Sequence, residues 1–132
     1  MVVNERRWPL VQVDYDGPQT MDDHRTLERS VDTYLERREP FALVFTSRPG
    51  GRGDPATTRA QVRWLEEGRD RLRGWIAAWA MVVDAKEKAA MDRGRGVGMV
   101  RRMPFPCASF VDPAEAFDWA AARIAAHVRS AR

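Results

Sequence analysis

The residues with the most chemical potential lie in the stretch DRGRGVGMVRRMPFP, residues 92–106. Glycine-rich turns cradle phosphates when they directly follow a strand and open a helix. Gly94, Gly96 and Gly98 recur at spacing two, follow a short predicted helix and lack the lysine of a phosphate-binding P-loop. The pattern therefore favours a connection between two elements, with a helix stop at Gly94.

A basic docking site is the alternative that this stretch leaves open. Hydrophobic residues such as Val97 and Met99 interleave with its arginines. Mixed apolar and basic side chains suit an acidic protein surface or an anionic membrane face, and single-stranded nucleic acid would call for aromatic platforms. The sequence therefore predicts a protein partner with an acidic surface in preference to nucleic acid. The basic candidates are Arg93, Arg95, Arg101 and Arg102, with Lys86 and Lys88 just upstream.

Polar residues at the ends of predicted strands form a second candidate site, because open α/β sheets bind ligands there. Asp16 closes the first predicted strand and Asp84 the third, and such a carboxylate pair could do acid–base work. Ser47 and Arg48 end the second predicted strand. The favoured alternative is that these residues cap loops and turns.

The histidines and the single cysteine do not form a metal-ligand pattern. Neither His24 nor His127 has a second ligand at zinc spacing, so the sequence predicts no metal and no cofactor. A nucleophilic cysteine needs a base beside it, and Cys107 fits a buried structural thiol better.

The chain alternates strands and helices, which predicts a single α/β domain over residues 1–132 with a four-stranded, mostly parallel or mixed sheet flanked by helices. Period-two apolar residues, continuous apolar runs and helix caps identify the elements. The predicted strands are 8–16, 41–47, 78–85 and 107–111, and the predicted helices are 20–38, 55–74, 86–93 and 112–132. The apolar run after residue 74 could also extend the second helix.

In the predicted second helix, Trp64 lies off the main apolar stripe. Val62 and Leu65 are expected to face inward, which would leave the indole exposed. An exposed tryptophan on a helix is a common interface anchor, so Trp64 joins the candidate partner-binding residues.

Composition places the chain among soluble globular proteins. Hydrophobic residues make up 44% and charged residues 31% of 132 residues, and the net charge is +3. The N-terminal segment has no apolar core of a signal peptide, no apolar run has membrane-spanning length, and one cysteine allows no internal disulfide. These features predict a cytoplasmic protein. The composition leaves a homodimer open.

The order of elements resembles the STAS-like proteins related to the SpoIIAA-like group. The resemblance is carried by GWIAAWAMVVDA, residues 74–85, and by the closing FPCASFVDPAEAFDWAAARI, residues 105–124. It implies a small α/β domain, generally noncatalytic, that binds a protein or a small anionic or lipid-like ligand and acts in regulation. The Asp-Ser-x-Gly phosphoserine motif of some members is absent here. A small enzyme or ligand-binding domain, with a pocket at the strand ends under residues 93–105, is the alternative.

Overall fold

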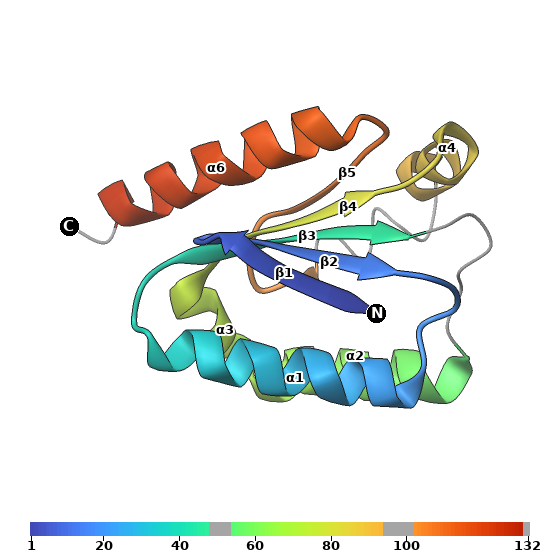
Figure 1. The fold of residues 1–132 in the computed structure, drawn as a ribbon, viewed down its shortest axis with the longest axis horizontal. Helices are drawn as coiled ribbons and strands as arrows, with labels where there is room; N and C mark the ends of the chain where they lie inside the picture. Colours follow the sequence, from blue (N-terminus) through green and yellow to red (C-terminus); the bar gives the residue numbers. More distant parts are fainter. Residues whose placement is uncertain (48–53, 94–101, 131–132) are drawn as a thin grey trace.

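A computed structural model describes residues 1–47, 54–93 and 102–130 of the chain. Its centre is a five-stranded sheet whose strands lie side by side in the order of the sequence, β1-β2-β3-β4-β5 (Figure 1). The β1 and β2 strands are antiparallel, and every later neighbour is parallel. The predicted α/β class with a mixed sheet is confirmed, but the predicted number of four strands is wrong.

The strand that the sequence analysis missed is β1 (Val2–Arg7), which forms a hairpin with β2 (Leu10–Tyr15). Its last four residues are all polar or charged, so its sequence lacks the apolar alternation of a half-buried strand. An edge strand tolerates such residues because much of its surface meets solvent, and charges on an edge discourage pairing with other chains.

The three remaining strands are parallel, and β3 and β4 are largely buried, as predicted. β3 (Phe41–Ser47) matches its predicted range, and β5 (Cys107–Phe110) ends one residue early. β4 (Ile76–Val82) begins two residues before the prediction and ends three residues earlier. The alternative in which the helix continues through this apolar run is wrong. Helices cover both faces of this part of the sheet, so side chains on both sides of a strand are buried. This burial explains the continuous apolar runs.

The first helix, α1 (Met21–Glu36), begins with a reciprocal capping box. The Thr20 hydroxyl accepts from the Asp23 backbone N–H at 3.1 Å, and the Asp23 carboxylate accepts from the Thr20 N–H at 3.0 Å. This arrangement satisfies two backbone donors that would otherwise lack partners at the helix start. The start of the helix predicted over residues 20–38 is therefore confirmed.

The predicted helix over 55–74 is two helices, α2 (Pro55–Glu67) and α3 (Arg69–Trp75). They meet at Gly68, whose backbone approaches its neighbours closely. A Cβ atom there would lie 3.2 Å from the Trp64 carbonyl oxygen and 3.3 Å from the Leu72 side chain. Glycine therefore suits this junction, and it was the available signal of the break.

Two helices complete the chain in the regions where helices were predicted. α4 (Ala85–Arg93) follows β4, and α6 (Pro113–Ser130) follows β5. The Asp112 carboxylate accepts from the Ala114 N–H at 3.0 Å, and Pro113 is the first helical residue. The predicted start of the last helix is confirmed.

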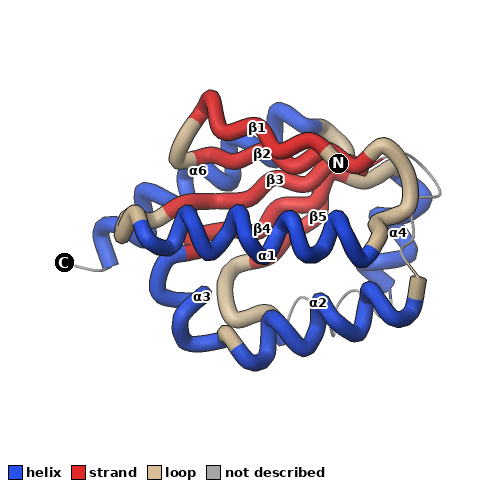
Figure 2. Tube along the Cα trace, turned by 60° about the horizontal axis from the view of Figure 1, so that its bottom comes forward, coloured by secondary structure: helices blue, strands red, loops and turns tan. Residues whose placement is uncertain are grey.

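The helices divide between the two faces of the sheet. α1, α2 and α3 lie on one face and α6 on the other, while α4 lies at the end where β4 points (Figures 1 and 2). The first face packs large apolar side chains, among them Leu43, Phe45 and Trp79. The second packs small ones, Ala42, Ala78 and Ala80, against Ala116 and Ala120 of α6.

Candidate functional site

The carboxyl ends of the parallel strands form the edge of the sheet where ligands of open α/β folds usually bind. β2, β3 and β4 all point towards this edge, next to α4 (Figure 1). Asp16 and Asp84 follow β2 and β4, and Ser47 ends β3. The structure thus brings these candidates to a common edge, while their function stays a prediction. Arg48, Arg95 and Arg101 lie outside the described residues.

Asp84 has a structural role at this edge. Its Oδ1 accepts from the Glu87 backbone N–H at 2.7 Å, and its carbonyl oxygen accepts from the Lys88 N–H at 2.9 Å. These contacts cap the start of α4. β3 lies between the strands that carry Asp16 and Asp84. Two strand spacings amount to about 10 Å, so the two carboxylates are not a directly hydrogen-bonded pair.

Lys88 connects α4 to the edge of the sheet. Its Nζ donates to the Ser109 carbonyl oxygen at 3.0 Å and lies 3.4 Å from an Asp92 carboxylate oxygen. No side chain of α4 is buried. Lys86 and Arg93 are exposed, so α4 presents basic side chains to solvent.

Arg102 lies close to α3, which the sequence analysis did not foresee. The Arg69 guanidinium donates to the Arg102 carbonyl oxygen at 3.0 Å, and both side chains are exposed. The sequence analysis missed Arg69 as a candidate. The available sequence signal for Arg69 was that it interrupts the apolar stripe of the helix predicted over residues 55–74.

Some of the exposed basic side chains form ion pairs and others do not. Arg37 lies 3.5 Å from Glu5, and Arg71 lies 3.1 Å from Asp32. Within residues 1–47, 54–93 and 102–130, four exposed basic groups have no carboxylate within ion-pair distance. Lys86 and Arg93 belong to α4 at the carboxyl edge, whereas Arg69 and Arg102 meet at the start of α3, which lies at the opposite end of the sheet from α4 (Figure 1). We call these four residues the basic set.

Trp64 is buried, with 8% of its surface exposed, so its predicted exposure is wrong. Its ring meets the buried His24 edge-on, with 5.9 Å between ring centroids. Val62, expected to face inward, is instead 48% exposed. The buried face of α2 runs through Thr57 and Trp64, seven residues apart, so the apolar stripe was assigned to the wrong side of the helix.

His24 packs between α1 and α2. Its Nε2 lies 2.9 Å from a Glu28 carboxylate oxygen, without the alignment of a hydrogen bond. The ring is 2% exposed and faces Trp64, so it belongs to the helix interface.

The prediction of a buried thiol at Cys107 is confirmed. Its side chain is buried opposite Trp79 in the parallel ladder, and burial raises the pKa of the thiol to about 12. A thiol with this pKa is protonated at neutral pH and is a poor nucleophile.

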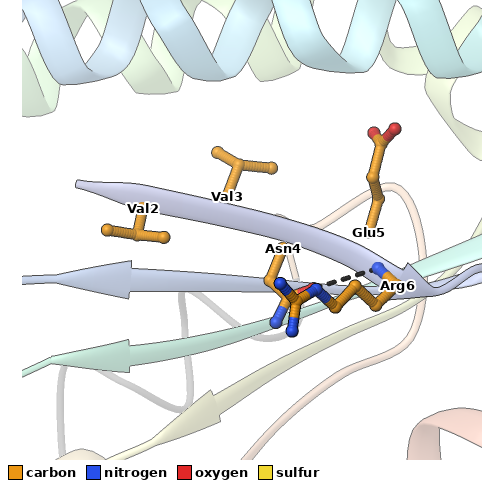
Figure 3. A pocket seen from close by; sticks show the side chains of 5 residues that line it. All are labelled: Val2, Val3, Asn4, Glu5 and Arg6. Atoms are coloured by element: carbon orange, nitrogen blue, oxygen red, sulfur yellow. Dashed lines mark hydrogen bonds between the residues drawn. The ribbon is translucent and has the colours of Figure 1, made fainter.

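A polar group on the α6 side of the sheet was also missed as a possible binding surface. Gln12 Nε2 donates to the Asp14 carboxylate at 3.0 and 3.2 Å, and the Thr46 hydroxyl donates to the same carboxylate. β1 continues this surface and lines a hollow of about 500 Å³ with Val2–Arg6 (Figure 3). Val3 and Glu5 point to one side of the strand and Val2, Asn4 and Arg6 to the other. The alternating polar residues of β2 were the available signal.

Comparisons and searches add little to this geometry. The chain matches no protein-family model, no curated protein and no solved structure. The described residues contain no group of three or more histidine, cysteine, aspartate or glutamate side chains placed to hold a metal ion. Among the described helices, none has both the length and the apolar character needed to cross a membrane.

Proposed function

We propose that this protein is a noncatalytic binding or regulatory module of the STAS-like kind, and that it docks an acidic protein surface through the basic set. The resemblance of the third-strand and closing segments to STAS-like proteins supports the class. The cations of the basic set, which have no carboxylate within ion-pair distance among the described residues, support the chemistry of the partner. Exposed charges of one sign accelerate the encounter with an oppositely charged surface.

The observation that carries this proposal is the contact between Arg69 and Arg102. The Arg69 guanidinium donates to the Arg102 carbonyl oxygen at 3.0 Å and so holds two arginines from distant parts of the sequence next to each other. Both side chains are exposed, so the contact brings two positive charges to one part of the surface. A carboxylate of a partner would be attracted to this part of the surface and could accept hydrogen bonds from a guanidinium group.

The surroundings of the strand-end carboxylates favour binding over acid–base catalysis. The Asp84 carboxylate is engaged as the cap of α4, and Asp16 lies two strands away from it. The alternative of an enzyme with a pocket at this edge would need these groups to act on one substrate.

The test is the binding of a fluorescent glutamate-rich peptide, measured by stopped flow at low and high salt. Replacing Lys86, Arg93 and Arg102 with alanine should slow association about tenfold at low salt, because steering by exposed charges raises association rates by tenfold or more. The difference should shrink at high salt, where the Debye length falls to about 3 Å.

A matched control removes three exposed cations elsewhere, Arg25, Arg29 and Arg129. The control has the same net charge as the test variant, so a general charge effect would slow both proteins equally. That outcome, or an unchanged rate in the test variant, would contradict docking through the basic set.

A further inference from the structure

The sheet is unevenly covered on its α6 side. Five strands at a spacing of about 4.8 Å span roughly 19 Å, and a helix with its side chains is about 10–12 Å wide. Among the described elements, α6 is the helix on this side and packs on the small residues of β3 and β4 (Figure 1). A strip over β1 and the adjoining side of β2 therefore remains beside α6. We call this strip the open strip.

The strand register identifies the floor of the open strip. Leu10 and Gln12 pair with Ala42 and Val44, which face α6, so they lie on the same face of the sheet. Asn4 pairs with Gln12, which extends this face onto β1. Val2 lies on the same side and is 55% exposed. The floor is thus polar in its middle, with exposed apolar surface at its end.

One flank of α6 borders the open strip. The Arg7 guanidinium of β1 lies over the Phe117 ring, 4.9 Å from its centroid, so this flank faces β1. Ile124 and Val128 follow Phe117 at seven and eleven residues and lie on the same flank of the helix. Phe117 and Ile124 are only partly buried, and Val128 is 37% exposed. This flank of α6 is therefore apolar and only partly covered.

We propose that the open strip is filled by α6 of a second copy of this chain. A two-fold axis parallel to α6 would place the two helices side by side between two sheets. Each α6 would then cover its own β3 and β4 on one side and the partner's open strip on the other. The flanks with Phe117, Ile124 and Val128 would meet across the axis, so that residues of the same number contact each other.

Charge complementarity favours a second copy as the occupant. The outward side of α6 carries the exposed Ala121 and Ala125, which allow close approach to another surface, and the exposed Asp118. Because Phe117 lies level with Arg7, its neighbour Asp118 lies at the same height along the strands. In the dimer this carboxylate faces the partner's β1, where Arg6 and Arg7 are exposed. The pairing forms twice, because the interface is symmetric.

Sedimentation of the full chain over a range of concentrations tests this proposal, with a dimer of twice the 15.1 kDa chain mass as the expected species. Val128→Glu should weaken dimerisation about tenfold or more, because it buries a pair of like charges at the axis. Val62→Glu is the matched control, since Val62 is an exposed helix valine on the opposite side of the sheet. It should leave the dimer unchanged.

Cross-linking tests the direction of the helices. Val128→Cys should form a disulfide-linked dimer under mild oxidation, because the axis places the two introduced thiols next to each other, whereas Val62→Cys should not. The native Cys107 is buried and common to both variants. A monomer at every concentration, equal weakening by both glutamates, or equal cross-linking by both cysteines would overturn the proposal.

This interface is separate from the basic set. Dimerisation can therefore fail while binding of the acidic peptide persists, and the reverse also holds.

Discussion

The two faces of the sheet differ in how their side chains pack, although the same strands form both. On the α1–α3 face, aromatic and branched side chains fill the space under three helices, with Phe45 and Trp79 at 4.3 Å between ring centroids. On the other face, Ala42, Ala78 and Ala80 let α6 approach the strands closely. The first face holds most of the buried apolar volume, and that volume is the main source of stability.

This difference indicates which face of such a fold is available to bind a partner. A face filled with large side chains and covered by three helices has little surface left to offer. A face built on alanines and covered by one helix keeps polar and apolar surface beside that helix. The predictions below test this division, from the largest expected effect to the smallest.

Removing a large side chain from the α1–α3 face should cause the greatest loss of stability. Leu43 is fully buried in the central strand β3. Leu43→Ala should lower the free energy of unfolding by about 2–5 kcal/mol, because it removes buried apolar contacts and leaves a cavity. Urea unfolding followed by circular dichroism measures this change. A loss below about 1 kcal/mol would mean that this face is not the main core.

Enlarging a small residue on the α6 face should cost less. Ala80 of β4 is fully buried against α6. Ala80→Leu should lower the free energy of unfolding by about 1–3 kcal/mol, because overpacking forces α6 away from the strands. Hydrogen exchange should show the loss of protection concentrated in α6. Equal loss in α1 would show that the two faces do not respond separately.

The sequence revealed most of this architecture, because the parallel strands and capped helices have strong local signals. The run Phe41–Ser47 is apolar for its buried length, and the cap residues Thr20 and Asp112 mark two helix starts. β1 was missed because its exposed edge position, not its own composition, makes it a strand. Its pairing with β2 is a tertiary fact that no local pattern contains.

The candidate site was predictable only in part. That the polar residues Asp16, Ser47 and Asp84 end neighbouring strands follows from the alternation of elements. Arg69 and Arg102 are 33 residues apart, so only the folded chain shows their contact. Trp64 was misassigned because Val62 and Leu65 suggested a helix face that the packing of α2 against α1 does not use.

Alkaline pH should weaken the α1–α3 face through Cys107. Burial raises the pKa of this thiol to about 12 in the folded protein, above its value in the unfolded chain. Its contribution to stability is therefore complete below about pH 8.5 and is lost as the pH rises towards 12. Between pH 9 and 10 this loss amounts to roughly 1 kcal/mol.

Cys107→Ala isolates this effect, because its packing cost does not depend on pH. The free energy of unfolding of the variant should fall less steeply above pH 9 than that of the native chain. Parallel curves would show that the thiol ionises equally in the folded and unfolded states. Labelling with a thiol reagent offers an independent measurement, since the buried thiol should react only when the protein opens.

The smallest effect should come from the open strip, and neighbouring residues of β2 give a direct comparison. Gln12 faces the open strip and is partly exposed, whereas Val11 faces α1 and is fully buried. Gln12→Ala should change the free energy of unfolding of the monomer by less than about 0.5 kcal/mol, because solvent replaces its hydrogen bond to Asp14. Val11→Ala should cost at least about 1 kcal/mol, because it leaves buried surface without contacts. Urea unfolding at a protein concentration well below that of dimer formation measures both. Equal costs would show that the strip is as tightly packed as the opposite face, and then no second helix could lie on it.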